Sequence, residues 1–208
     1  MSKKLIAAVL AVIVIACVAV SGTFAYLFFK GETISNTFTI GDVDVTFTET
    51  TGDSSTHEHG ILPGKDTAKN PTVTVGKGSE DSYVFVELQE VCTASGKKFS
   101  DYLTYTVGTD FTELTGAGLT GHKVYYYFYT ADKNNDKVLS VLKDNKVTAT
   151  NFDNAAKTAL EGKELSLNIN AGAIQNSADF TGATANAKAL AAWNALVGGD
   201  KTLFSLAN

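Results

Sequence analysis

The stretch that decides the fold is SYVFVELQEVC, residues 82–92. Its side chains are apolar or aromatic at consecutive positions from Tyr83 to Val86, and again at Leu88. β-Branched and aromatic residues are enriched in strands. A short run that is apolar on both alternating faces is typical of a strand that is covered on both sides. The stretch therefore predicts a central strand of a β-sheet.

Most of the chain beyond residue 36 continues this signal with a period of two residues, the side-chain period of a strand. HKVYYYFYT, residues 122–130, is the most strongly β-forming stretch, with aromatic side chains from Tyr125 to Tyr129. The same reasoning predicts further strands at residues 71–76, 101–108, 138–142, 163–176 and 201–208.

One predicted strand changes phase part-way. In NTFTIGDVDVTFTET, residues 36–50, Phe38 and Ile40 share one face, whereas the apolar positions after Gly41 are odd-numbered, from Val43 to Phe47. A one-residue slip at a glycine is what a β-bulge produces. We expect one long, bent strand whose exposed face carries threonine and aspartate.

Two segments have helix signals: residues 151–162 and the alanine-rich residues 183–199, each ending in glycine. Residues 50–70 and 131–137 read as a polar connection and a turn. Many short strands with turn signals and only two short helices predict a mainly β protein, an antiparallel β-sandwich of jelly-roll type.

The N-terminus has the layout of a secretory signal peptide. Lys3 and Lys4 precede an apolar run of sixteen residues, 5–20, and small residues follow. Cleavage between Ala25 and Tyr26 predicts a signal peptide at 1–25 and one domain at 26–208. Two alternatives stay open. In the first, the hydrophobic segment is retained as a membrane anchor, since residues 24–29 would extend it to a spanning length. In the second, Cys17 is the lipidated residue of a lipoprotein.

Charge and composition exclude some functions. The 208-residue chain has a net charge of −5 and no arginine, and loss of the two N-terminal lysines lowers the charge to −7. An acidic chain without a basic run argues against nucleic-acid binding. Only Cys92 survives in the mature chain, which therefore has no intramolecular disulfide. No phosphate loop, dinucleotide fingerprint or G-x-S-x-G motif occurs, so we expect no cofactor and no enzyme activity.

His57, Glu58 and His59 form one cluster of metal-ligand residue types. Histidine and glutamate bind zinc and other divalent ions, but two histidines two positions apart in a polar loop need a third ligand that is fixed elsewhere. A solvated loop is the alternative interpretation.

A second candidate is the segment DKNND, in which Asp132, Asn134 and Asp136 match the first three ligand positions of a calcium loop. The match then fails, because Lys137 replaces the glycine and Lys143 the bidentate glutamate. A hairpin turn explains the same residues. The tyrosines at 125–127 have two interpretations as well: core residues, or a sugar- or peptide-binding platform.

The junction SGTFAYLFFKGETISNTFTIGDVDVTFTE, residues 21–49, resembles the N-terminal segment of the TasA and camelysin family, exported proteins of Gram-positive bacteria that are processed by the signal peptidase SipW. Blocks at 61–88, 124–142 and 173–196 resemble the same family. The positions that carry the junction resemblance are Gly22, Thr23, Ala25, Tyr26, Asn36, Phe38, Gly41 and Val43.

The resemblance implies a secreted matrix or cell-surface protein of jelly-roll fold, often a component of biofilm fibres. Its partners would be further copies of itself, a signal peptidase of the SipW type and an accessory matrix protein. Relatives polymerise head-to-tail by donating the freed N-terminal strand, here residues 26–36. The donor side chains would be those of Tyr26, Leu27, Phe28 and Phe29. Camelysin-like relatives are described as metallo-endopeptidases, which is the alternative function.

Overall fold

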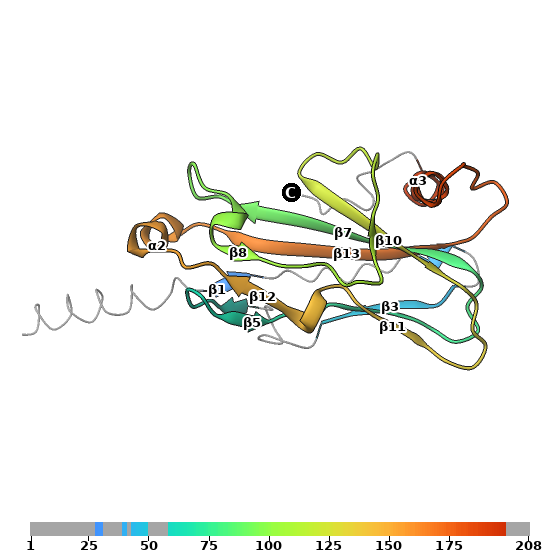
Figure 1. Ribbon diagram of the computed structural model, residues 1–208, viewed down its shortest axis with the longest axis horizontal. Coiled ribbons are helices and arrows are strands. Elements are labelled where there is room, and N and C mark those ends of the chain that lie inside the picture. Colours follow the sequence, from blue (N-terminus) through green and yellow to red (C-terminus); the bar gives the residue numbers. More distant parts are fainter. Residues whose placement is uncertain (1–27, 31–38, 41–42, 50–57, 199–208) are drawn as a thin grey trace, which may run out of the picture.

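The structure is a computed structural model that describes residues 28–30, 39–40, 43–49 and 58–198. This part of the chain is mainly β, with two α-helices, α2 (Asn154–Leu160) and α3 (Ala185–Leu196) (Figure 1). The strands are β1 (Phe28–Lys30), β2 (Thr39–Ile40), β3 (Val45–Thr48), β4 (Glu58–Gly60), β5 (Asp66–Ala68), β6 (Thr72–Val75), β7 (Ser82–Cys92), β8 (Leu103–Thr104), β9 (Thr112–Glu113), β10 (His122–Tyr129), β11 (Lys137–Ser140), β12 (Lys146–Ala149) and β13 (Leu165–Gln175); short 3-10 helices lie at Phe99–Asp101 and Lys143–Asn145.

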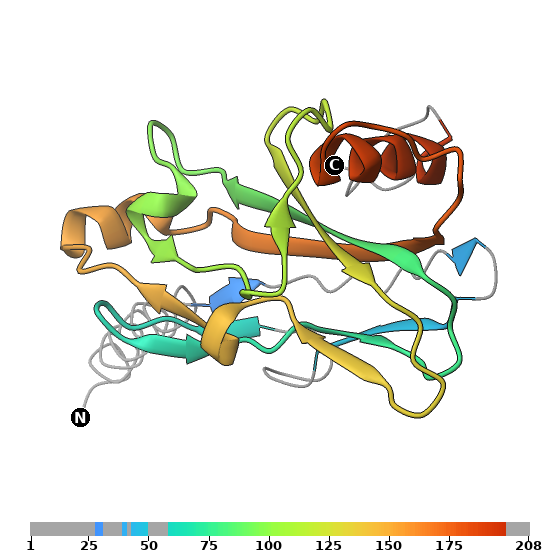
Figure 2. The same ribbon diagram turned by 45° about the vertical axis from the view of Figure 1, so that its right-hand side comes forward.

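The strands lie in two layers (Figures 1 and 2). One layer is a five-stranded sheet with the order β2-β13-β7-β10-β9. The other holds two three-stranded sheets, β11-β6-β3 and β5-β12-β8, one after the other along the long axis of the molecule. Every described pair of strands is antiparallel except β2 with β13, which is parallel.

The prediction of a central strand at residues 82–92 is confirmed. β7 lies between β13 and β10 and is buried from Ser82 to Leu88. Its even-numbered residues, such as Val84 and Val86, belong to the core between the layers. Its odd-numbered residues face the other way, where Trp193 of α3 packs on Phe85 with ring centroids 5.3 Å apart. The strand is apolar on both faces because each face has its own core.

The main core between the layers follows the two-residue period. β3 has buried and exposed residues in strict alternation, so Val45 and Phe47 face inward and the threonines face solvent. The exposed threonine and aspartate face predicted for residues 43–48 is therefore confirmed. Buried side chains from both layers meet in this core: Val45, Phe47, Val73, Val75, Leu139 and Val147 from one, Val84, Val86, Leu167 and Ile169 from the other.

The prediction of one long, bent strand at residues 36–50 is wrong. β2 pairs with β13 in the five-stranded sheet, whereas β3 pairs with β6 in the other layer. The chain changes layers between Ile40 and Val45, so the apolar phase changes because the partner sheet changes. A bulge and a layer change leave the same one-residue slip in the sequence.

Other expectations need correction too. The polar connection predicted at 50–70 contains β4 and β5. β5 is short and half-exposed and lies at the edge of its sheet, so it has no apolar alternation to reveal it. β9 and β12 were not predicted. The predicted hairpin after β10 is also wrong, because β11 pairs with β6 in the opposite layer.

Both helix predictions are confirmed. Asp153 caps α2 by accepting a hydrogen bond from the Ala156 N–H, and Thr184 caps α3 in the same way through Ala187. The predicted signal peptide at 1–25, the Ala25–Tyr26 bond and the strand at 201–208 lie outside the described residues. Within the described ranges, no helix has the length and apolarity that a membrane crossing requires.

Candidate functional site

The predicted donor strand and the His-Glu-His segment pair with each other. β1 runs antiparallel to β4, with Phe28 opposite Gly60, Phe29 opposite His59 and Lys30 opposite Glu58. This pair forms a two-stranded sheet of its own, at the end of the molecule that carries α2 (Figures 1 and 2). The backbone of β1 also approaches β13. Tyr26, Leu27 and His57 lie outside the described residues.

β1 and β4 are short, and neither belongs to the larger sheets. Each contributes three residues, and the five-stranded and three-stranded sheets are complete without them. Small two-stranded units are only marginally stable in water. The described residues of β1 therefore form a small separate sheet with β4, next to β13.

The predicted zinc candidates are placed only in part. Glu58 and His59 are consecutive residues of β4, whereas the remaining histidine, His122, lies in β10 of the five-stranded sheet. Among the residues that the structure describes, no group of three or more His, Cys, Asp or Glu residues could hold a metal ion.

The calcium-loop candidates form the turn that links the two layers. Asp132 Oδ1 accepts hydrogen bonds from the N–H groups of Asn134, at 2.8 Å, and Asn135, at 3.2 Å. The Asn135 side-chain amide donates to the other carboxylate oxygen, Asp132 Oδ2. The hydrogen bonds from the Asn134 N–H and the Asn135 side chain lower the pKa of Asp132 because they favour its ionised form. Asp136 Oδ1 accepts from the Lys77 N–H at 2.8 Å. Both carboxylates thus stabilise backbone N–H groups, as the turn interpretation predicts.

The tyrosine run is divided between the two faces of β10. Tyr126 is buried in the outer core beside α3, while Tyr125 and Tyr127 are half-buried against the core between the layers. Cys92 ends β7 as a half-buried free thiol that packs against the same inner core. These residues contribute mainly to packing, although Cys92, Tyr125 and Tyr126 each also line a surface groove.

Two buried ionisable pairs escaped the sequence reasoning. Glu87 is fully buried in β7, and its Oε1 lies 2.7 Å from Nδ1 of His122. Burial lowers the pKa of His122. Lys69 Nζ lies 3.0 Å from Oε2 of Glu49, and burial lowers the pKa of this lysine. The sequence feature that could have revealed Glu87 is a charged residue within the apolar run of β7. Glu49 and Lys69 lie in polar sequence, so no local pattern indicates that they are buried.

No protein-family model, no curated protein and no solved structure matches this chain. The resemblance to the TasA and camelysin family stays a prediction from the sequence.

Proposed function

We propose that the protein is a secreted, non-enzymatic structural protein of the extracellular matrix or cell surface. Its fold would be a β-sandwich of jelly-roll type, and subunits would polymerise head-to-tail by donation of the N-terminal strand, residues 26–36. The observation that carries the proposal is the pairing of β1 with β4 in a small sheet separate from the larger ones.

The physical argument is that the N-terminal strand of one subunit can replace that of another. Because β1 pairs with β4 and not with a strand of the larger sheets, its departure would break no strand pairing within them and would remove only its approach to β13. The same segment of a second copy would make the same backbone hydrogen bonds to β4, so the exchange replaces each contact with an equivalent one. An exchanged strand that joins unlike surfaces is a heterologous contact, which propagates into filaments when the rotation does not close.

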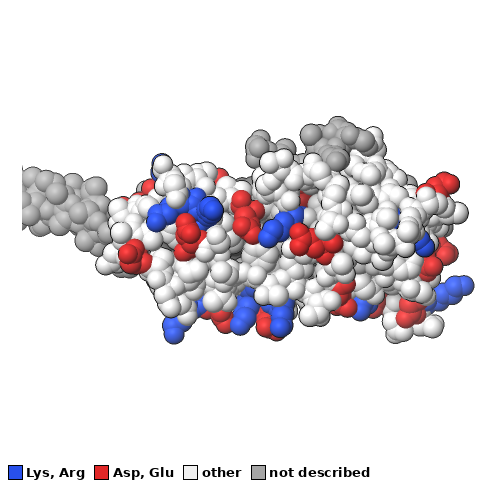
Figure 3. Space-filling model, turned by 45° about the horizontal axis from the view of Figure 1, so that its top comes forward, with Lys and Arg blue, Asp and Glu red and all other residues white. Residues whose placement is uncertain are grey.

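Export would control the exchange. While residues 1–25 precede the strand, it would be tethered to a hydrophobic segment. Cleavage between Ala25 and Tyr26 by a signal peptidase of the SipW type would free it. Lysines and acidic residues intermingle over the face in Figure 3, which suits a matrix protein better than a nucleic-acid binder. An accessory matrix protein would be a further partner.

The test compares fibre formation by the mature chain from Tyr26 with that of a chain lacking residues 26–36. We expect fibres in electron microscopy only from the longer chain. A matched control keeps residues 26–30 and replaces 31–36 by a Gly/Ser linker of equal length; it should still polymerise. Fibres of the same kind from the truncated chain, or no fibres from the mature chain under any condition, would overturn the proposal.

A further inference from the structure

We propose that a groove beside the first turn of α3 binds an acidic glycan, a chain of pyranose rings that carry carboxylates. This aromatic groove has a volume of 790 Å³, within the roughly 300–1,000 Å³ range of small-molecule sites. The inference does not depend on polymerisation, because the groove lies on the outer face of the five-stranded sheet and β1 takes no part in it. The lining residues that carry the argument are Tyr83, Phe128, Phe180, Asn176, Ser177 and Lys188.

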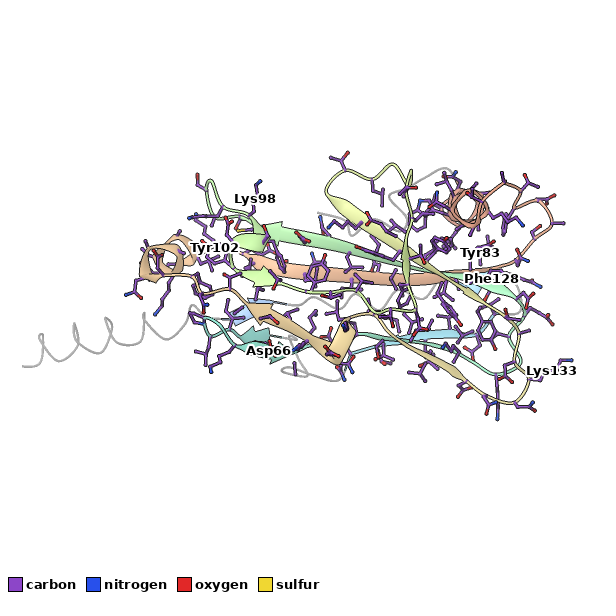
Figure 4. All side chains as sticks on the ribbon, in the orientation of Figure 1. Asp66, Tyr83, Lys98, Tyr102, Phe128 and Lys133 are labelled. Atoms are coloured by element: carbon purple, nitrogen blue, oxygen red, sulfur yellow. The ribbon has the colours of Figure 1, made fainter. Side chains whose placement is uncertain are left out.

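The floor of the groove consists of aromatic rings. Tyr83 and Phe128 are direct partners on β7 and β10, with ring centroids 4.9 Å apart and an interplanar angle of 62°. Figure 4 shows the two residues next to each other toward the α3 end of these strands. Phe180 adds a third ring, 6.1 Å from that of Tyr83. Phe128 is 38 % exposed, although the other aromatic residues of β10 are half-buried or buried.

The wall is the connection between β13 and α3, and its backbone is held in place at both ends. The Asn176 N–H donates to the Asp81 carbonyl at 2.7 Å. At the other end, a Cβ added to Gly182 would lie 2.5 Å from Cβ of Ala187. The wall therefore packs directly on the first turn of α3, and the groove exists before any ligand binds.

Two polar side chains at the rim are available to a ligand. Within the part of the chain that the structure describes, the amide of Asn176 and the ammonium of Lys188 make neither a hydrogen bond nor an ion pair. No acidic side chain is among the described residues that line the groove. Lys188 is the charged side chain among the described lining residues and matches a carboxylate, while Asn176 matches hydroxyl groups. Ser177 already exchanges hydrogen bonds with Asp179 of the same wall.

The position of the floor favours a glycan over a peptide. A peptide that adds to a sheet needs a free strand edge, but Tyr83 lies in the central strand, paired with Phe128 on one side and Ile174 on the other. At Tyr83 the groove thus offers ring surfaces and separate polar groups but no free strand edge; on its other side, β10 pairs with β9 through Tyr125 and Tyr126 among the described residues. Pyranose rings match this pattern, because their C–H faces pack on aromatic rings while their hydroxyl groups point sideways.

The experiment is calorimetric titration of the full-length chain with a galacturonate pentamer and with the same pentamer as its methyl ester. We expect the acidic pentamer to bind with a Kd on the order of 0.1–1 mM and the ester to bind more weakly. Phe128→Ala should weaken both by about tenfold or more, since a stacking surface is lost. Lys188→Gln should weaken only the acidic pentamer, because its partner is the carboxylate.

Matched controls are Val138→Ala, which truncates a 59 % exposed apolar residue of β11 in the other layer, and Lys133→Gln in the turn before that strand. Neither should change the titrations. Phe128→Leu keeps most of the side-chain volume and removes the ring. If its thermal midpoint equals that of the parent, the variant is folded and any loss of binding comes from the missing ring. Titrations without heat up to about 10 mM, Phe128 variants that bind like the parent, or preferential binding of an aromatic-rich peptide at this groove would each overturn the proposal.

Discussion

At the scale of single residues, polar side chains in this protein mostly organise its backbone. Asp132 and Asp136 match metal ligands by spacing, yet each carboxylate accepts a hydrogen bond from a backbone N–H. The link is long-range for Asp136, whose donor is Lys77 at the start of another loop. Such a contact cannot be read from a local motif, because the donor lies 59 positions away.

We predict that Asp132→Asn lowers the thermal midpoint at pH 7 and has little effect at pH 2. The folded-state pKa of Asp132 is below its usual value because N–H groups favour the ionised form. Its stabilisation is therefore fully present above the unfolded pKa and is lost as the pH falls through the lowered folded pKa. Melting curves at several pH values check this, with Lys133→Ala in the same turn as the control. A midpoint difference that stays constant down to pH 2 would contradict it.

At the scale of elements, α3 acts as the cover for the outer face of the five-stranded sheet. Its buried residues, including Trp193 and Leu196, pack on Phe85 and Val124 in a core separate from the one between the layers. The helix has no acidic residue in its first turn and no basic residue in its last, so its stability comes from this packing rather than from its own charges.

We predict that Trp193→Ala destabilises the protein by about 3–5 kcal/mol, the usual cost of deleting a large buried aromatic side chain. Trp193 is fully buried, and its ring lies edge-to-face on Phe85. Denaturant unfolding measures the loss. Asn194→Ala, at the next and exposed position of the helix, should change stability by less than about 0.5 kcal/mol. A Trp193→Ala cost as small as that of the control would show that α3 is not part of the cooperative fold.

At the scale of the whole molecule, the proposed function depends on whether the peptide bond between Ala25 and Tyr26 is cleaved. If the chain is cut between Ala25 and Tyr26, the strand at 26–36 becomes a free N-terminus, and the proposed exchange has its donor. If the bond stays intact, we expect the hydrophobic N-terminal segment to anchor a single domain at the membrane.

Intact-mass measurement on protein exported from a Gram-positive host separates these cases. We expect a mature chain of 183 residues, counted from Tyr26 of the 208-residue sequence. The full-length mass would support the anchored domain instead, and a lipid adduct on Cys17 would support the lipoprotein interpretation. An Ala25→Leu variant should retain the precursor mass, since a large side chain replaces the small residue before the cleaved bond.

The sequence by itself determined the positions of the long strands β7, β10 and β13 and of both helices. It did so because burial of one or both faces leaves a periodicity of two in strands, and because each helical segment ends at a glycine. Only the tertiary structure decided which strands pair. β2 and β3 read as one strand but lie in different layers, and β10 and β11 read as a hairpin but also belong to different layers. The pairing of β1 with His59 and Glu58, and the meeting of Tyr83, Phe128 and Phe180 in one groove, arise in the same way. A local pattern records whether a side chain is buried; which residue buries it depends on contacts between segments that are distant in sequence.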